Sequence, residues 1–207
     1  MIVVVAAVFV PPRSAWAQPE IHILAFGDSL TAGYSLASSE SFAAQLESRL
    51  RENGHKVRVT NAGVSGDTSG GGLARLDWSL QDRPDLVILE LGANDGLRGL
   101  KPERMRENLE AIIAKIQATE ARIILAGMRS PVNWGPAYRI AFEEVFPDLA
   151  KKYSLAFYPF FLEGVLSEPS LLLDDGLHPN ARGVARIVDG ILPVVTTELQ
   201  TLTQTAD

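Results

Sequence analysis

A serine, a histidine and an aspartate stand where they could carry out nucleophilic catalysis together. Ser29 lies in the segment Gly-Asp-Ser-Leu-Thr, directly after an apolar run typical of a strand (residues 21–26). Asp175 and His178 lie three residues apart near the C-terminus, close enough for the carboxylate to hold one imidazole nitrogen. A serine hydroxyl becomes nucleophilic when a base takes its proton, and that base works best when a third group orients it. These residues therefore predict a serine hydrolase.

Each of these residues also has a structural alternative. Ser29 could cap the N-terminus of a helix, the common role of a serine at a strand-to-helix turn. His178 could be a surface cap or a metal ligand, and Asp174 competes with Asp175 for the orienting role. The metal alternative is weak because the chain has three histidines, no cysteine and no His-Glu-x-x-His motif. We therefore expect an enzyme that uses neither a metal nor a cofactor.

Two further segments offer N–H donors for an oxyanion. Residues 61–68 follow the second apolar run and supply the backbone amides of Gly63 and Gly66. Residues 92–95 follow the third run and supply the side-chain amide of Asn94. The tetrahedral intermediate of acyl transfer requires such preorganised donors. Glycines also serve tight turns, and Asn94 could cap a loop, but both segments fall at neighbouring strand ends beside Ser29, which favours the catalytic interpretation.

The pattern around these residues alternates between strands and helices. Strands are predicted at residues 21–26, 56–60, 86–91, 122–126 and 155–158. Helices are predicted at residues 42–50, 73–80, 102–116, 136–153 (with a break at Pro147) and 184–192 (with a kink at Pro193). Such alternation predicts an α/β protein with three layers (α/β/α), in which helices cover both faces of a parallel sheet. Ligands bind outside the carboxyl ends of such strands, where the segments named above fall.

The composition fits one ordinary globular domain, with 207 residues, of which 46% are hydrophobic and 21% charged. The net charge of -6 argues against nucleic acid or an anionic membrane surface as the main partner. Residues 2–10 are continuously apolar and precede the A-x-A-like site Ala15-Trp16-Ala17, which predicts a signal peptide over residues 1–17 and export. No Lys or Arg precedes the run, so the basic start is expected further upstream; the alternative is a buried N-terminal strand.

Four short sequence motifs, taken in their order along the chain, resemble those of the SGNH (GDSL-type) hydrolases. Within that family they resemble the bacterial group of multifunctional thioesterases, lysophospholipases and arylesterases. The matching blocks are residues 27–30, 61–68, 91–96 and 175–180, and the resemblance covers roughly residues 22–200. It implies a flavodoxin-like five-stranded sheet (the SGNH hydrolase fold) in one domain, residues 18–207. Thr31 departs from the simplest motif but is tolerated in this group. A G-x-S-x-G nucleophile elbow would have a glycine at this position, so Thr31 also argues against the α/β-hydrolase arrangement.

The resemblance also implies a role for each site residue. Ser29 would be the nucleophile and an oxyanion donor through its own N–H, with Gly66 and Asn94 as the other donors. His178 would be the base and Asp175 its orienter. Residues 129–138 resemble the group's substrate-facing loop, which makes Pro131, Asn133 and Trp134 candidate substrate-binding residues; the alternative is a connecting loop that Trp134 anchors to the core.

The expected substrates are small acyl esters, thioesters and lysophospholipids, in the periplasm or outside the cell, with no nucleic-acid partner and no stable membrane anchor. One alternative is a carbohydrate O-acetyl esterase, which shares the chemistry. Another is a non-enzymatic binding domain that uses residues 65–72 as a phosphate loop. The absence of the G-x-x-x-x-G-K-[ST] and G-x-G-x-x-G motifs argues against the second alternative.

Overall fold

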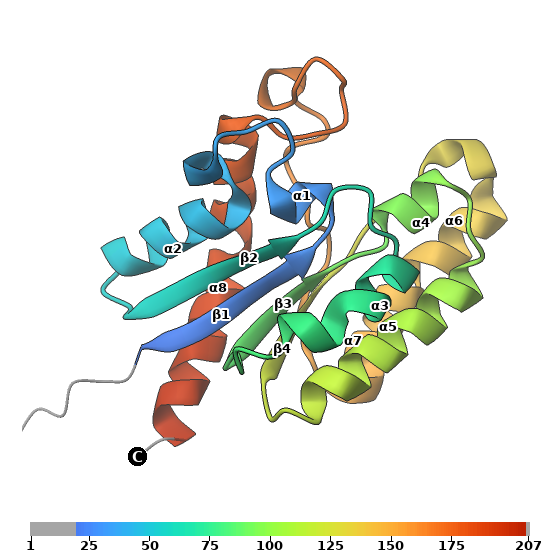
Figure 1. Ribbon diagram of the computed structural model, residues 1–207. Coiled ribbons are helices and arrows are strands. Elements are labelled where there is room, and N and C mark those ends of the chain that lie inside the picture. Colours follow the sequence, from blue (N-terminus) through green and yellow to red (C-terminus); the bar gives the residue numbers. More distant parts are fainter. Residues whose placement is uncertain (1–19, 206–207) are drawn as a thin grey trace, which may run out of the picture.

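Five parallel strands form one sheet at the centre of the computed structural model, which describes residues 20–205 (Figure 1). The order across the sheet is β2-β1-β3-β4-β5. The strands are β1 (Ile21–Gly27), β2 (Val57–Gly63), β3 (Leu86–Glu90), β4 (Arg122–Ala126) and β5 (Ala156–Tyr158). The predicted signal peptide lies outside the described residues. No helix in the described part of the chain is long and apolar enough to cross a membrane.

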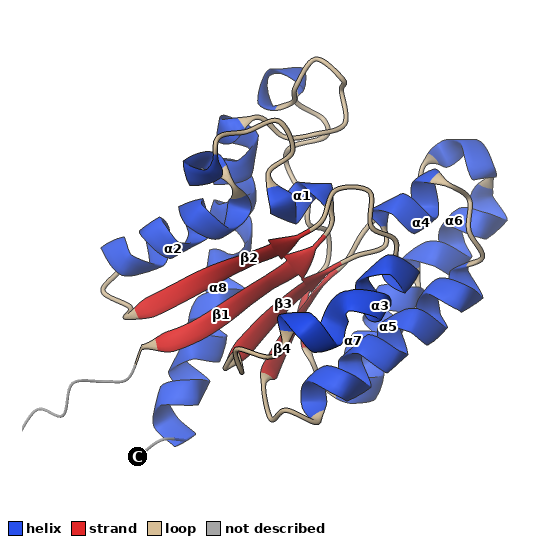
Figure 2. Ribbon diagram, viewed as in Figure 1, coloured by secondary structure: helices blue, strands red, loops and turns tan. Residues whose placement is uncertain are grey.

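Helices cover both faces of this sheet, as the alternating pattern predicted (Figure 2). On one face α2 (Phe42–Glu52) packs against α8 (Ala181–Thr205), and on the other α3 (Ser69–Ser79), α5 (Pro102–Gln117) and α7 (Val145–Tyr153) pack together. Three short helices lie at the carboxyl edge of the sheet, namely α1 (Ser29–Ala32), α4 (Ala93–Leu97) and α6 (Pro136–Glu143). Single 3₁₀ turns form at η1 (Ser38–Glu40), η2 (Val132–Trp134) and η3 (Pro169–Leu171).

The two prolines at which the sequence predicted a break and a kink, Pro147 and Pro193, occupy different positions in their helices. The break between α6 and α7 falls at Glu144, three residues before the predicted position, and Pro147 lies in the first turn of α7. A proline is tolerated there because a first-turn N–H has no acceptor within its own helix. Helix α8 runs through Pro193 and continues to Thr205. The prediction of two helical segments is therefore right, and the position of the break was wrong.

The strand order decides where a site can form. After β1 the chain moves to one side of this strand to form β2, and then returns to its other side to form β3. The loops that follow β1 and β3 therefore diverge, and the crevice between them is where ligands bind in such sheets. The register aligns the ends of the strands, since Gly27 pairs with both Gly63 and Glu90. Ser29 and α4 follow directly, at the same edge.

Candidate active site

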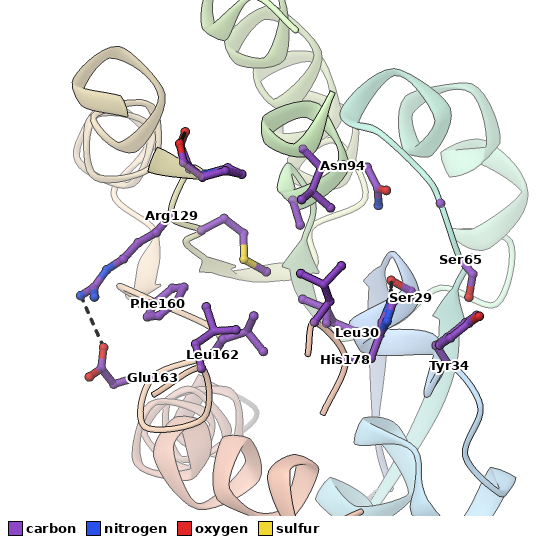
Figure 3. Close-up of a pocket in the computed structure, with 18 of the residues that line it drawn as sticks. Ser29, Leu30, Tyr34, Ser65, Asn94, Arg129, Phe160, Leu162, Glu163 and His178 are labelled. Atoms are coloured by element: carbon purple, nitrogen blue, oxygen red, sulfur yellow. Dashed lines mark hydrogen bonds and ion pairs between the residues drawn. The ribbon is translucent and has the colours of Figure 1, made fainter. Parts of the chain in front are cut away.

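Ser29, His178 and Asp175 form a continuous hydrogen-bonded chain. The Nε2 atom of His178 lies 3.0 Å from Oγ of Ser29, and its Nδ1 atom lies 2.6 Å from Oδ2 of Asp175. The start of α1 and the loop before α8 meet here, and Figure 3 shows the two side chains of Ser29 and His178 pointing toward each other. The arrangement has the geometry that lets an imidazole accept a proton from a serine hydroxyl.

The aspartate in this chain is held by its own loop. Oδ1 of Asp175 accepts the backbone N–H groups of Leu177 (2.9 Å) and His178 (3.0 Å). These two hydrogen bonds, with that of the imidazole, lower the pKa of Asp175 to about 2 because they favour its ionised form. Gly176 has a φ of +67°, which allows the tight turn. Asp174 is exposed and makes no side-chain hydrogen bond within residues 20–205, so Asp175 is the aspartate that contacts the imidazole.

The hydroxyl of Ser29 is available because another residue caps α1. Asp28 is the N-cap, and its Oδ1 accepts the backbone N–H of Leu30 at 3.0 Å. Its other oxygen, Oδ2, accepts the side-chain amide of Asn94 at 3.1 Å. Ser29 is the first residue of the helix itself. The capping role that could have explained Ser29 therefore belongs to its neighbour.

Ser29, Gly66 and Asn94, the three predicted oxyanion donors, line one cavity. Neither the backbone N–H of Ser29 nor that of Gly66 has an acceptor in the described part of the chain. The Gly66 backbone has a φ of +86°, a conformation that favours glycine. Gly63, the weaker candidate, donates its N–H to Oδ1 of Asn61 at 2.9 Å. Of the two glycines, Gly66 is thus the one with a free donor beside Ser29.

Two buried carboxyl groups lie beneath this turn, and sequence reasoning missed both. Oε2 of Glu90 accepts the Thr31 hydroxyl (2.7 Å) and the Asp28 backbone N–H (3.3 Å), whereas its Oε1 has no partner among the described residues. Burial raises the pKa of Asp28 to about 6. Burial and the nearby Asp28 carboxylate raise the pKa of Glu90 well above its usual range. Both oxygens of Asp28 accept hydrogen bonds that favour its ionised form, whereas Oε1 of Glu90 accepts none from the described residues, so Glu90 is the member of the pair that keeps its proton at neutral pH.

The cavity has a volume of about 660 Å³ and a largely apolar wall (Figure 3). Met128, Phe160, Leu162 and Leu166 line it away from Ser29. At the other side the ring of Tyr34 lies 4.3 Å from the His178 ring, centroid to centroid. A concave apolar space beside a few polar groups is typical of a site that binds a small organic substrate.

Part of the apolar wall comes from the segment after β5, which the sequence analysis did not identify as part of the site. Phe160, Leu162 and Leu166 follow β5, so they lie beyond the carboxyl end of the fifth strand. The expectation that ligands bind at strand ends was used for the first four strands and missed this apolar segment. Tyr34 carried no comparable signal, because its contact with His178 joins distant parts of the chain.

The loop predicted to face the substrate divides into two parts. Pro131 lines the cavity, but Asn133 and Trp134 do not. Trp134 instead donates its Nε1–H to the Gly96 carbonyl at 2.8 Å, and its ring lies against Gly99. Trp134 therefore anchors the loop to α4, as the alternative left open by the sequence has it, and its role in substrate binding stays a prediction. Asn133 is exposed on the same turn.

The side chains of residues 20–205 form no group of three or more His, Cys, Asp or Glu that could hold a metal. His22 lies at the start of β1, where its Nε2 contacts the Thr60 hydroxyl at 2.8 Å. It therefore belongs to the sheet and not to the edge that carries Ser29.

Comparisons with known proteins agree with this geometry. The model of the GDSL-like Lipase/Acylhydrolase family matches residues 25–186. Esterase TesA of Pseudomonas aeruginosa is 41% identical over 84% of this chain and 87% of its own. An arylesterase of Vibrio mimicus is 44% identical over 80% of this chain and 84% of its own. Thioesterase 1/protease 1/lysophospholipase L1 of Escherichia coli K12 is 41% identical over 81% of this chain and 79% of its own.

Solved structures show the same fold. The crystal structure of TesA superimposes with a TM-score of 0.81 at 40% identity, covering 86% of this chain and 99% of that one. The psychrotrophic esterase EstA from Pseudoalteromonas sp. superimposes with a TM-score of 0.83 at 34% identity, covering 87% of this chain and all of the other (100%). The predicted three-layer fold and the predicted family resemblance are confirmed.

The buried carboxyl pair predicts how stability depends on pH. The folded protein keeps protons on Glu90 and Asp28 that the unfolded chain releases above its ordinary carboxyl pKa values, so the free energy of unfolding should fall as the pH rises through that range. The slope is about 1.4 kcal/mol per pH unit for each proton. Glu90→Gln keeps an oxygen for Thr31 but has no proton to lose. We expect its decline between about pH 4 and pH 6 to be shallower than that of the wild type.

Denaturant unfolding at a series of pH values measures this difference. The exposed Glu168 provides the matched control, because Glu168→Gln removes a carboxyl that lies in solvent and should leave the decline unchanged. An identical decline in the wild type and Glu90→Gln would show that Glu90 holds no proton in the folded state.

Proposed function

The chain belongs to the GDSL-like lipase/acylhydrolase family and is an ester-cleaving hydrolase, and we propose that Ser29, His178 and Asp175 are its catalytic residues. One observation carries the proposal. The Ser29 hydroxyl lies 3.0 Å from the imidazole of His178 and opens into the apolar cavity. The similar esterase EstA is inhibited by monoethylphosphonate, a compound whose phosphorus can react with a nucleophilic hydroxyl.

In the proposed mechanism Ser29 Oγ attacks the acyl carbonyl carbon while its proton moves to Nε2 of His178. The carboxylate of Asp175 accepts the Nδ1–H and stabilises the imidazolium that forms. The oxyanion receives hydrogen bonds from the N–H groups of Ser29 and Gly66 and from the Asn94 amide. His178 then protonates the leaving alcohol or thiol. Water attacks the acyl-enzyme with His178 again as base, which releases the carboxylic acid and restores the Ser29 hydroxyl.

We propose fatty-acyl esters, thioesters and lysophospholipids as the substrate class. The apolar wall formed by Met128, Phe160, Leu162 and Leu166 suits an acyl chain better than a sugar, whose hydroxyl groups would need polar partners. The relatives named arylesterase and thioesterase 1/protease 1/lysophospholipase L1 support the same class. The apolar segment before residue 18 supports export to the periplasm or beyond, where acyl-CoA is not expected as the natural substrate.

Ser29→Ala removes the proposed nucleophile and should lower kcat for aryl esters by a factor on the order of 10⁶, because the three residues act as a unit. Labelling of the protein by a fluorophosphonate should stop as well. Both are measured against the wild type at matched folded fraction, which circular dichroism checks. Wild-type turnover or labelling in the variant would remove Ser29 from the mechanism.

The two neighbouring aspartates allow a matched test of the orienting role. Asp175→Asn replaces the acceptor of the Nδ1–H and should lower kcat by a factor on the order of 10⁴. Asp174→Asn changes an exposed side chain and should have little effect. Because the pKa of Asp175 is about 2, this carboxylate stays charged in mild acid and its protonation should not limit wild-type activity there. The pH–rate profiles of both variants test this assignment. A large loss of kcat in Asp174→Asn would assign the orienting role to Asp174.

Chain length tests the substrate class. The ratio kcat/KM for p-nitrophenyl esters should rise from acetate to longer acyl chains, and an acetylated glycan should be a poor substrate. Leu166→Asp places a charge in the cavity wall and should reduce hydrolysis of long-chain esters more than that of acetate. Trp78→Asp changes an exposed apolar side chain near the C-terminal end of α3, outside the wall, and should leave the profile unchanged. A preference for acetate or the glycan would favour the O-acetyl esterase alternative.

A further inference from the structure

The large apolar side chains that remain exposed gather around the cavity. Four of them (Tyr34, Leu97, Leu166 and Leu177) line it. Four more lie after α4, on η2 and on α6, and their exposed fractions are 40% for Leu100, 77% for Val132, 44% for Trp134 and 54% for Ile140. Val64 (43% exposed) precedes Ser65 of the cavity lining, and Trp78, at the far end of α3, stands apart from all of them. Exposed apolar patches of this kind mark surfaces that contact a partner.

Contacts between the segments make these residues one surface. Trp134 bonds to the carbonyl of Gly96 and packs against Gly99, and the hydroxyl of Tyr138 donates to the carbonyl of Leu100 at 2.7 Å. Figure 1 shows α4 and α6 close together at the carboxyl edge of the sheet. We call this surface the docking face; it comprises Leu97, Leu100, Val132, Trp134 and Ile140. Because Leu97 also lines the cavity, the docking face continues into the site.

Cations predominate in the segments that carry the docking face. Residues 97–101 and 128–142 contain Arg98, Lys101, Arg129 and Arg139 and no Asp or Glu, although the whole chain has a net charge of -6. The nearest acidic residues along α6 are Glu143, its last residue, and Glu144, which follows it. Arg129 pairs with Glu163. Arg98, Lys101 and Arg139 are exposed and form no ion pair within residues 20–205. Arg98 donates a hydrogen bond to the Gly66 carbonyl at 2.9 Å, whereas Lys101 and Arg139 make no side-chain hydrogen bond in the described part of the chain.

We propose that the docking face seats the enzyme on a phospholipid surface that carries anionic headgroups. Apolar side chains that enter the interface, with cations that meet lipid phosphates, are the combination by which proteins bind such surfaces reversibly. The proposal rests on the proposed function in one respect, since an acyl substrate could then pass from the lipid into the adjoining cavity. A second copy of the chain fits less well, because a two-fold pairing of this face would set its cations against each other.

The net charge of the whole chain argued against an anionic membrane surface as the main partner. The charges near the docking face, which are mostly positive, change that expectation. At physiological salt, charges separated by more than about 8 Å of solvent are largely screened, so the groups nearest to the lipid dominate. Glu163, the one acidic residue that lines the cavity in the described part of the chain, is paired with Arg129. The enzyme should therefore approach the surface with α4 and α6 first.

Sedimentation with vesicles tests the proposal. Wild-type protein should sediment with vesicles of phosphatidylglycerol and phosphatidylcholine in equal amounts, and much less with phosphatidylcholine alone or in high salt. Val132→Asp and Ile140→Asp, each made singly, should lower the partition coefficient several-fold. The double variant Lys101→Glu with Arg139→Glu should lower it about tenfold or more, because each cation near such a surface contributes several-fold to binding.

Two control variants match these changes at the opposite edge of the sheet. Trp78 and Lys151 lie near the C-terminal ends of α3 and α7, which precede β3 and β5, so both are far from the cavity. Trp78→Asp and Lys151→Glu should bind vesicles as the wild type does. Hydrolysis of a soluble short-chain aryl ester should be unchanged in all of these variants, since none of the substituted residues lines the cavity.

The outcomes separate the two proposals. Vesicle binding needs no turnover, so Ser29→Ala should still bind if the docking face is correct, whatever its activity. Failure of the wild type to bind anionic vesicles, or equal binding by the wild type and the docking-face variants, would overturn the docking proposal and leave the esterase unaffected. Self-association in analytical ultracentrifugation that Val132→Asp abolishes, without vesicle binding, would assign the face to a second copy instead.

Discussion

The buried carboxylate of Asp28 is the group on which the geometry of the site depends. One of its oxygens caps α1, which leaves the Ser29 hydroxyl free for His178. Its other oxygen accepts a hydrogen bond from the amide of Asn94, which lies in the first turn of α4, just after β3. A single side chain thus joins the loops that follow β1 and β3, the two loops whose divergence creates the crevice. Burying a carboxylate is costly unless its oxygens are hydrogen-bonded, and both oxygens of Asp28 are.

Glu90, at the end of β3, connects the turn that carries Ser29 to the sheet. It is the last residue of a strand whose five residues are all buried, and its carboxyl reaches the backbone N–H of Asp28 and the hydroxyl of Thr31. Gly27 makes room for it, because a Cβ at that position would lie 2.5 Å from Oε2 of Glu90. The turn that carries Ser29 is therefore held from below by a carboxyl that can serve as an acceptor without bearing charge. The uncharged form suits a position near the carboxylate of Asp28, whose charge raises the pKa of Glu90.

The sequence predicted those parts of the structure that depend on local patterns. Strand–helix alternation predicted the three layers, and the three-residue spacing of Asp175 and His178 predicted the contact that their loop makes. Helices α1 and α4 were missed because four or five residues are too few to show a helical period. The roles of Asp28 and Glu90 were missed because their partners are distant in the chain, as in the bond from Asn94 to Asp28, 66 residues apart. Hydrogen bonds of that kind leave no periodic signal.

The two carboxyl groups that hold the site together, those of Asp28 and Asp175, have pKa values shifted in opposite directions. Asp28 is buried and its pKa is raised to about 6, whereas Asp175 is exposed and backbone N–H groups lower its pKa to about 2. The ionisation of Asp175 therefore does not depend on whether substrate has displaced water from the cavity. An acyl chain in the apolar cavity would exclude water beside His178, which Tyr34 already covers on one side. Exclusion of water strengthens the attraction between the imidazolium and a carboxylate that is already charged, so the substrate itself completes the electrostatic environment of its own hydrolysis.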